Sequence, residues 1–228
     1  QDYHGRHGVA FDLSAGVAGF EAQDGHVTGV KFADGKVLPC DVADRDSLAA
    51  AAAQISAGGP LDRAITLAAL YDPGKVLDID PDRAAQIVTV NLTGSFNFVR
   101  AAVPLLRRGG QLALTGSVAG YVGLPQGQIY SATKAAVINL AETLRAELAP
   151  DIDVRLISPG FVATRLTEKN DFAMPALMQP DQAATAIVSG LDRHGFEVHF
   201  PRRFTLSLKL LRALPYALAL PLTKRLVR

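Results

Sequence analysis

The stretch from residue 111 to residue 148 constrains the fold of this chain more than any other. Residues 111–115 form an apolar run that is typical of a strand, and Gly109 and Gly110 before it indicate a turn. A loop follows, and then a helix that carries Tyr130 and Lys134 and continues to about Leu148. This order predicts a strand whose end lies close to the first turns of a helix.

Strand and helix patterns alternate along the whole chain from about Val37 onward. Asp44 and Asp80 are expected to cap two of the helices, with Pro81 at the first helical position. We therefore predict an α/β fold, a Rossmann-like three-layer sandwich with a mostly parallel sheet, in a single domain over residues 1–228. Strands are expected within 61–70 and at 111–115, 152–157 and 196–200, and helices at 45–56, 81 to about 107, up to about 148, and from 180.

Residues 1–38 follow a different pattern. Short runs that favour strands are separated by Asp-Gly pairs, which are strong hairpin signals. We predict an atypical β-rich segment, a β-meander, that joins the α/β part near residues 37–41. Its strands are expected at 8–13, 17–22, 26–32 and 36–40.

Composition excludes several classes of protein. Of 228 residues 49% are hydrophobic and 20% charged, which is typical of a globular chain with a real core. The single cysteine, Cys40, excludes a disulfide framework and a cysteine zinc site, and the five histidines join no cluster of ligands, so no metal site is expected. No signal peptide opens the sequence and no run of 18 apolar residues occurs, which makes the cytoplasm the expected location.

The charge is unevenly distributed, although the net charge is only +1. Residues 201–228 carry seven basic residues and no acidic one, against 16 basic and 22 acidic residues before them. Within 202–228 basic and apolar residues alternate, and Pro215 and Pro221 are expected to break this tail into short helices. Such a segment can lie on an anionic membrane surface, and it can equally cover a substrate pocket or a subunit interface. No nucleic-acid partner is expected, because no recognition motif occurs.

Three side chains suit proton transfer to an alcohol or ketone oxygen. Tyr130 and Lys134 are four residues apart and so share one face of a helix. A lysine ammonium group one turn away favours the tyrosinate and lowers the pKa of the phenol, which can then act near neutrality. The hydroxyl of Ser117 can hold the substrate oxygen. A bare Tyr-x-x-x-Lys also fits an ordinary amphipathic helix, so the upstream serine carries the interpretation.

These residues resemble the short-chain dehydrogenase/reductase family. Ser117, Tyr130 and Lys134 match its catalytic serine and its Tyr-x-x-x-Lys, and Asn91 matches its helix asparagine. The run 159–164, Pro-Gly-Phe-Val-Ala-Thr, matches its Pro-Gly-x-x-x-Thr loop, and Cys40-Asp41-Val42 matches the Asp-Val after its third strand. The resemblance runs from about Val37 to the C-terminus.

The resemblance implies an NAD(P)-dependent oxidoreductase that interconverts a secondary alcohol and a ketone. Tyr130 would be the general acid or base, Lys134 would lower its pKa and hold the ribose, Ser117 would bind the substrate oxygen, and Asn91 would support a proton relay from an inward position rather than lie on the surface. Contacts with NAD or NADP are implied for Asp41, Val42, Ala69, Asn91, Tyr130, Lys134, Pro159, Gly160, Val162 and Thr164.

The family also implies a homodimer or homotetramer, formed through the helices that end near Arg107 and Leu148. Residues 165–179 would form the substrate lid. Their apolar side chains favour a hydrophobic alcohol or ketone as substrate, or they fold against the core.

The chain departs from the family in two places. Residues 1–38 lack the Thr-Gly-x-x-x-Gly-x-Gly turn that lets a pyrophosphate approach the backbone, and residues 14–20 are the best candidate for it, with two glycines of the three. The segment is instead similar to a strand-and-meander piece of the nicotinamide domain of FAD-dependent ferredoxin reductases, which does not carry the flavin site. Where the family has Asn-Asn-Ala-Gly, residues 66–69 are Thr-Leu-Ala-Ala. The alternative function is therefore a non-catalytic chain that keeps the catalytic residues but cannot hold the cofactor.

Overall fold

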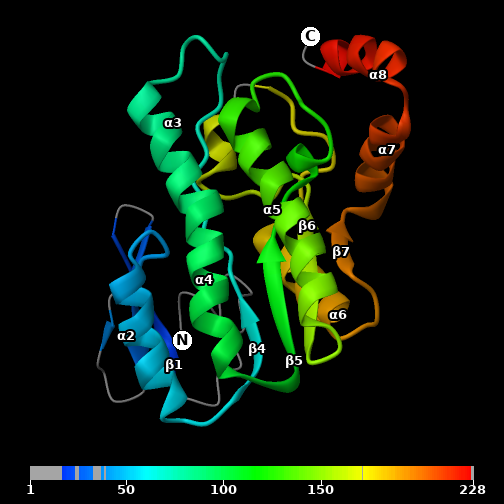
Figure 1. Ribbon diagram of the computed structural model, residues 1–228. Helices are drawn as coiled ribbons and strands as arrows, with labels where there is room; N and C mark the ends of the chain where they lie inside the picture. The colour runs from blue at the N-terminus through cyan, green and yellow to red at the C-terminus, as the bar shows by residue number, and fades with distance from the viewer. Residues whose placement is uncertain (1–16, 24–25, 33–36, 39, 171, 227–228) are drawn as a thin grey trace.

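The parallel sheet is the centre of the molecule. The computed structural model describes residues 17–23, 26–32, 37–38, 40–170 and 172–226. Four strands lie side by side in chain order, all parallel (Figure 1). They are β4 (Leu61–Ile65), β5 (Leu106–Thr115), β6 (Ile152–Pro159) and β7 (Glu197–Phe200). With helices on both faces, they confirm the predicted Rossmann-like α/β fold.

Both faces of this sheet are buried, as expected for parallel strands. Leu112 and Leu114 of β5 pack with α4 (Gly94–Ala102) and α5 (Gln128–Leu148) on one face. Ala113, between them, points to the other face and packs with α6 (Pro180–Leu191). Alternate residues of β5 therefore pack against the helices of opposite layers.

Local caps set where the helices begin. Asp44 accepts hydrogen bonds from the backbone N–H groups of Asp46 and Ser47 at the start of α2 (Arg45–Ser56). Asp80 does the same for α3 (Pro81–Val88), which has its proline in the first turn. The predicted bounds of α2, and the predicted end of α5, are confirmed.

The long helix expected from Pro81 to about Arg107 ends earlier and is not uniform. After α3 the chain passes through a π-helical turn, η1 (Thr89–Thr93), then α4, then a 3-10 turn, η2 (Val103–Leu105). The predicted end is wrong because residues 106–108 already belong to β5. The two glycines expected as a turn before β5 lie inside it, where the pairing shifts from Leu61 opposite Leu106 to Arg63 opposite Gln111. Gly109 has a φ of +76°, which a glycine adopts without strain.

Two further expectations are corrected in the same way. The strand expected within residues 61–70 is β4, and it ends at Ile65, so residues 66–69 of its predicted apolar part, 64–69, lie outside the strand. Pro215 separates α7 (Arg202–Ala213) from α8 (Tyr216–Thr223), as predicted, but Pro221 lies inside α8 instead of breaking it. Only two residues of α8 follow Pro221, and a 3-10 turn, η5 (Lys224–Leu226), comes directly after them. Because proline has no backbone N–H, α8 lacks one backbone hydrogen bond near its C-terminal end.

The N-terminal segment forms a separate antiparallel sheet. β1 (Val17–Gln23), β2 (His26–Phe32) and β3 (Val37–Leu38) pair in that order, which confirms the predicted meander over these residues. β3 pairs with β2 and not with the parallel sheet. The strand expected at 8–13, and residues 14–16 of the candidate glycine turn, lie outside the described residues. The resemblance to a ferredoxin-reductase piece stays a prediction.

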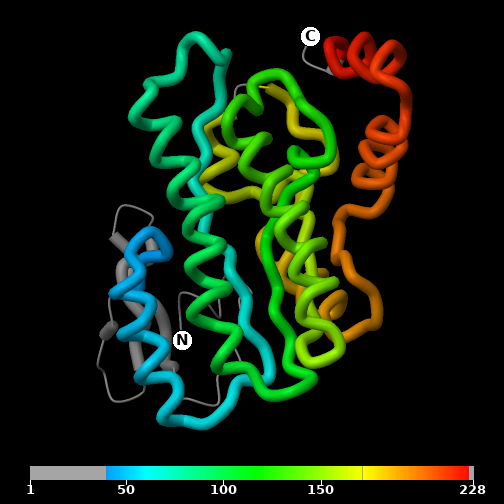
Figure 2. Tube along the Cα trace, in the orientation of Figure 1, coloured from blue at the N-terminus to red at the C-terminus, as the bar shows by residue number. Residues whose placement is uncertain are grey.

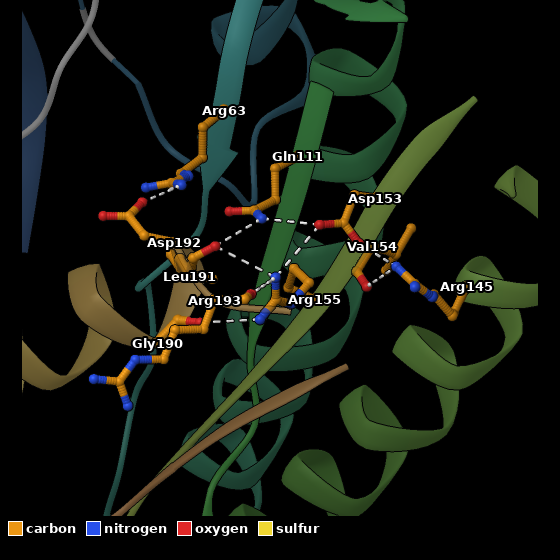
Figure 3. A network of polar contacts seen from close by, with 10 residues as sticks. All are labelled: Arg63, Gln111, Arg145, Asp153, Val154, Arg155, Gly190, Leu191, Asp192 and Arg193. Carbon is orange, nitrogen blue, oxygen red and sulfur yellow. Dashed lines mark hydrogen bonds and ion pairs between the residues drawn. The ribbon is translucent and has the colours of Figure 1, made fainter. Parts of the chain in front are cut away.

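A buried arginine fastens α6 to the sheet (Figure 3). The Arg155 side chain of β6 donates to the carbonyl oxygens of Gly190 and Arg193, at 3.0 and 2.8 Å, and more weakly to that of Leu191. It also faces Asp153, which Gln111 and Arg145 hold from β5 and α5. Carbonyl groups in the last turn of a helix have no hydrogen-bond donors within the helix. The Arg155 guanidinium provides such donors at the end of α6.

Candidate active site

Ser117 and Tyr130 meet where β5 ends and α5 begins. Ser117 starts a short 3-10 turn, η3 (Val118–Gly120), and its hydroxyl accepts a hydrogen bond from the Ala119 N–H at 3.1 Å. Gly120 lets this turn lie directly on α5, because a Cβ there would stand 2.7 Å from the backbone of Lys134. The turn thus places Ser117 and Tyr130 on the lining of the same cavity.

Lys134 lies behind Tyr130 and is almost fully buried, with 2% of its surface exposed. Its ammonium group donates to the carbonyl oxygen of Thr115 at 2.8 Å, and it lies 5.7 Å from the centre of the Tyr130 ring. Burial lowers the pKa of Lys134 to about 8. A lysine with one bonded acceptor retains two further N–H donors.

The pKa of Tyr130 departs from the expectation. Burial raises the pKa of the phenol above its ordinary value, and the Ser117 hydroxyl acts in the opposite direction. The sequence predicts that Lys134 lowers this pKa; the net direction is upward, and the contribution of Lys134 stays a prediction. Burial of the phenol is the largest cause, and the Lys134 ammonium group is hydrogen-bonded to the Thr115 carbonyl.

Asn91 is held inward, as predicted, and the alternative of a surface asparagine is wrong. The side chain is fully buried in the π-helical turn η1. Its amide accepts from the Leu70 N–H at 2.7 Å, donates to the Leu70 carbonyl at 2.9 Å, and donates to the Thr133 hydroxyl at 3.1 Å. Asn91 therefore ties the segment after β4 to α5. The water relay from Lys134 stays a prediction.

A cavity of about 100 Å³ opens beside Ser117 and Tyr130. Its lining is largely apolar, with Phe161 and Phe172 in edge-to-face contact on one side. The segment 165–179, expected as a lid, contributes to this lining. The other lining residues are Tyr71, Val118, Ala119, Leu124, Pro125, Gly127, Ser131, Gly160, Leu166, Thr167 and Asn170.

Tyr71 is a member of the site that the sequence did not reveal. Its ring packs against that of Tyr130, with centroids 4.7 Å apart, and its hydroxyl donates to Asn170 of the lid at 2.7 Å. Lys169 adds an ion pair with Asp72 at 3.6 Å. The available signal was an aromatic residue directly after the apolar run that follows β4. Figure 2 shows this segment passing next to the lid at the carboxyl ends of the strands.

The residues expected to touch a cofactor fall into two groups. Pro159 ends β6, Gly160 reaches the cavity, and Val162 and Thr164 follow in a turn held by the Thr167 hydroxyl. Asp41 and Val42 lie elsewhere: Val42 packs against Gly94, and its carbonyl accepts from Asn97 at 3.0 Å. Ala69 is half-buried after β4.

The described residues include no group of three or more histidine, cysteine, aspartate or glutamate side chains that could hold a metal ion. None of the described helices is both long enough and apolar enough to cross a membrane.

Comparisons with known proteins agree with this geometry. Residues 27–174 match the profile of a family described as short chain dehydrogenase. An uncharacterized oxidoreductase of Myxococcus xanthus is 32% identical over 160 residues, which cover 69% of this chain and 63% of that protein. A short-chain type dehydrogenase/reductase of Sinorhizobium fredii, also uncharacterized, is 35% identical over 170 residues, covering 72% and 66%. The chain thus spans just under two thirds of the length of these relatives.

A solved structure is similar over more of the chain. It is a short-chain dehydrogenase from Burkholderia cenocepacia in complex with NADP, with a TM-score of 0.72 and 27% identity, covering 84% of this chain and 80% of that one. The family profile spans well over half of the residues, and the fold agrees with it. The chain belongs to the short-chain dehydrogenase family.

Proposed function

We propose that the protein is an NAD(P)-dependent oxidoreductase that interconverts a secondary alcohol and a ketone. The observation that carries this is that Ser117 and Tyr130 line the same largely apolar cavity, with the Lys134 ammonium group 5.7 Å from the centre of the Tyr130 ring. The lining by Phe161, Phe172 and Leu124 favours a hydrophobic substrate.

The side chains suit ketone reduction as follows. Ser117 donates a hydrogen bond to the carbonyl oxygen and so stabilises the negative charge that develops there. Tyr130, whose raised pKa keeps it protonated at neutral pH, delivers its proton to that oxygen. The charge left on the phenolate is stabilised by the Lys134 ammonium group. A bound nicotinamide cofactor would supply the hydride in this direction and accept it in the reverse one.

The residues present fit the nicotinamide–ribose half of such a cofactor. Lys134 is a buried cation whose only bonded acceptor in the described part of the chain is the Thr115 carbonyl, so its two remaining donors suit ribose hydroxyls. Pro159, Gly160, Val162 and Thr164 follow β6 at the same end of the sheet, where open α/β sheets bind ligands. The NADP in the Burkholderia cenocepacia relative supports NAD or NADP as the cofactor.

The part of the chain that would bind the phosphate half of the cofactor favours a second candidate, a chain that cannot hold the cofactor. The sequence has no complete glycine-rich turn, and β1–β3 form a sheet of their own instead of extending the parallel sheet beyond β4. Val42 is engaged with α4, and the Asp41 backbone N–H donates to the Ser47 hydroxyl of α2. In this alternative Ser117, Tyr130 and Lys134 remain without catalysing a reaction.

One titration separates the two candidates. Purified protein is titrated with NADH and NADPH by calorimetry, together with the variants Tyr130→Phe and Val76→Ser, the latter an exposed control away from the cavity. We expect low-micromolar binding of one nucleotide by all three proteins. Turnover of a hydrophobic ketone should fall 10²- to 10⁴-fold in Tyr130→Phe alone, because only the proton donor is lost. An absence of binding at millimolar nucleotide would reject the enzyme in favour of the second candidate.

We further propose that the protein is a homodimer or homotetramer, assembled through α4 and α5. Phe96 of α4 is half exposed, which is consistent with a contact on that face.

A further inference from the structure

The C-terminal helices lie along one edge of the molecule and expose apolar side chains (Figures 1 and 2). One face of α7 is fixed to the body: Thr205 and Leu208 are buried, and Lys209 forms an ion pair with Glu197 of β7. The opposite face exposes Leu206 and Leu210, and Leu210 is 67% exposed. The sequence thus gives α7 a second apolar stripe that no part of the described chain covers.

α8 is more exposed still. Ala219 and Thr223, one turn apart, are its buried residues. The rest of the helix surface presents large apolar side chains to solvent, with Tyr216 82% exposed. The exposed apolar residues of α7 and α8 are Leu206, Leu210, Tyr216, Leu218, Leu220 and Leu222, which we call the tail surface. Contiguous apolar patches of this kind mark interaction sites.

The charges that the C-terminal residues themselves carry all have one sign. Within residues 201–228 there are seven basic residues and no acidic one. Five of the basic side chains are exposed and form no ion pair with any described residue; Lys209 is the paired exception. The five are Arg202, Arg203, Arg212, Lys224 and Arg225.

We propose that the tail surface docks on an anionic lipid surface. An interfacial helix needs apolar side chains flanked by arginine and lysine. Its apolar side chains enter the acyl boundary of the bilayer, while its arginine and lysine side chains contact lipid phosphates. A second copy of this chain fits less well as the occupant, since two surfaces that carry only positive charge repel each other. The contact is peripheral, because none of the described helices could cross a bilayer.

The tail surface begins next to the cavity. Phe204, near the start of α7, packs on Phe161 with ring centroids 5.8 Å apart, and Phe161 in turn contacts Phe172 of the lid. α8 lies at the same end of the molecule as the carboxyl ends of β5 and β6 (Figure 1). If the proposed function holds, a lipid-dissolved substrate would therefore reach the cavity from the docked face. Docking itself does not depend on that function.

Vesicle co-sedimentation of the full chain tests the proposal without measuring activity. We expect at least tenfold stronger partitioning to phosphatidylglycerol-containing vesicles than to pure phosphatidylcholine vesicles, weakened by salt. Arg212→Glu/Lys224→Glu/Arg225→Glu should reduce binding to the anionic vesicles at least a hundredfold. Leu218→Ser/Leu220→Ser/Leu222→Ser should reduce it at least tenfold. All the replaced side chains are exposed, so thermal unfolding should stay close to wild type.

Matched controls use exposed side chains outside the tail. Arg45→Glu/Arg193→Glu changes charge outside the tail, and Val76→Ser/Leu77→Ser removes apolar surface outside the tail. Both variants should bind anionic vesicles nearly as strongly as wild type does, and the first should be weakened only by its lower net charge. Equal binding to both vesicle types, or equal losses in tail and control variants, would overturn the proposal. So would a tail variant that changes the mass in solution from an oligomer to a monomer while vesicle binding is unchanged, since the tail surface would then be a subunit interface.

Discussion

At the scale of single residues, the buried ammonium group of Lys134 connects the site to the stability of the protein. Burial lowers its pKa from 10.5 to about 8, so the folded chain holds this proton less tightly than the unfolded chain does. A shift of this size corresponds to about 3 kcal/mol of folding free energy. Under the proposed function, the same buried charge would stabilise the Tyr130 phenolate and contact a ribose, which gives this cost a use.

The consequence can be measured as a dependence of stability on pH. Between pH 8 and about 10.5 the unfolded chain binds a proton that the folded chain has released, so for this group the free energy of unfolding rises with pH. The difference in unfolding free energy between wild type and Lys134→Met should therefore rise by up to about 3 kcal/mol across this window. Urea denaturation from pH 7 to pH 10 measures it. Parallel curves for the two proteins would show that the pKa of Lys134 is not lowered.

Residues whose role depends on near neighbours in the sequence were predicted, and those that depend on distant contacts were not. Tyr130 and Lys134 share a helix face by spacing alone, and Asn91 was assigned an inward position from its motif. Tyr71 was missed because its partner, Asn170, is 99 residues away. The raised pKa of Tyr130 also escaped prediction, because it depends on how far the folded chain buries the phenol.

At the scale of elements, the same distinction separates correct ends from wrong ones. The bounds of α2 were predicted because the Asp44 carboxylate fixes its first turn locally. The start of β5 was not, because it follows from pairing with β4 at Leu106 and from the bond of the Gly109 N–H to the Asp151 carbonyl at 2.7 Å. Strand pairing of this kind joins residues that no local pattern relates.

The end of α6 gives a testable case of an element held by one side chain. Arg155→Met would remove one donor from the carbonyl oxygens of Gly190 and Arg193, and one of the two guanidinium partners of the Asp153 carboxylate. We expect a loss of about 3 kcal/mol in the free energy of unfolding, since removing one partner from a buried network of hydrogen bonds and ion pairs is costly. Arg193→Met is the matched control: its side chain is exposed and only its backbone takes part, so a change within about 0.5 kcal/mol is expected.

Urea denaturation of both variants measures this difference, and hydrogen exchange of the amides in α6 locates it. Similar losses in the two variants would mean that the arginine network does not hold the helix.

At the scale of the whole molecule, two sheets have to behave as one unit if the chain is a single domain. The third strand of the antiparallel sheet β1–β3 comprises two residues in the part of the chain that the structure describes, and small sheets without packing are marginal in water. Its link to the body runs through α2, which contacts both β3 and α4. The junction is tight, since a Cβ at Gly94 would stand 2.7 Å from the side chain of Val42. If residues 1–228 form the predicted single domain, this junction must couple the unfolding of the two sheets.

Cooperative unfolding tests that requirement. The sequence contains no tryptophan, so Phe20→Trp in β1 and Phe98→Trp in α4 each place one fluorescent reporter in one part of the molecule. In a single domain, the fluorescence transition of each variant should coincide with its own transition followed by far-ultraviolet circular dichroism. We expect coincidence in both, because β1–β3 lacks the size to remain folded once α2 detaches. A Phe20→Trp signal that changes at lower urea than the dichroism would instead show that residues 17–38 unfold as a separate unit, and the chain would then have to be described as two domains.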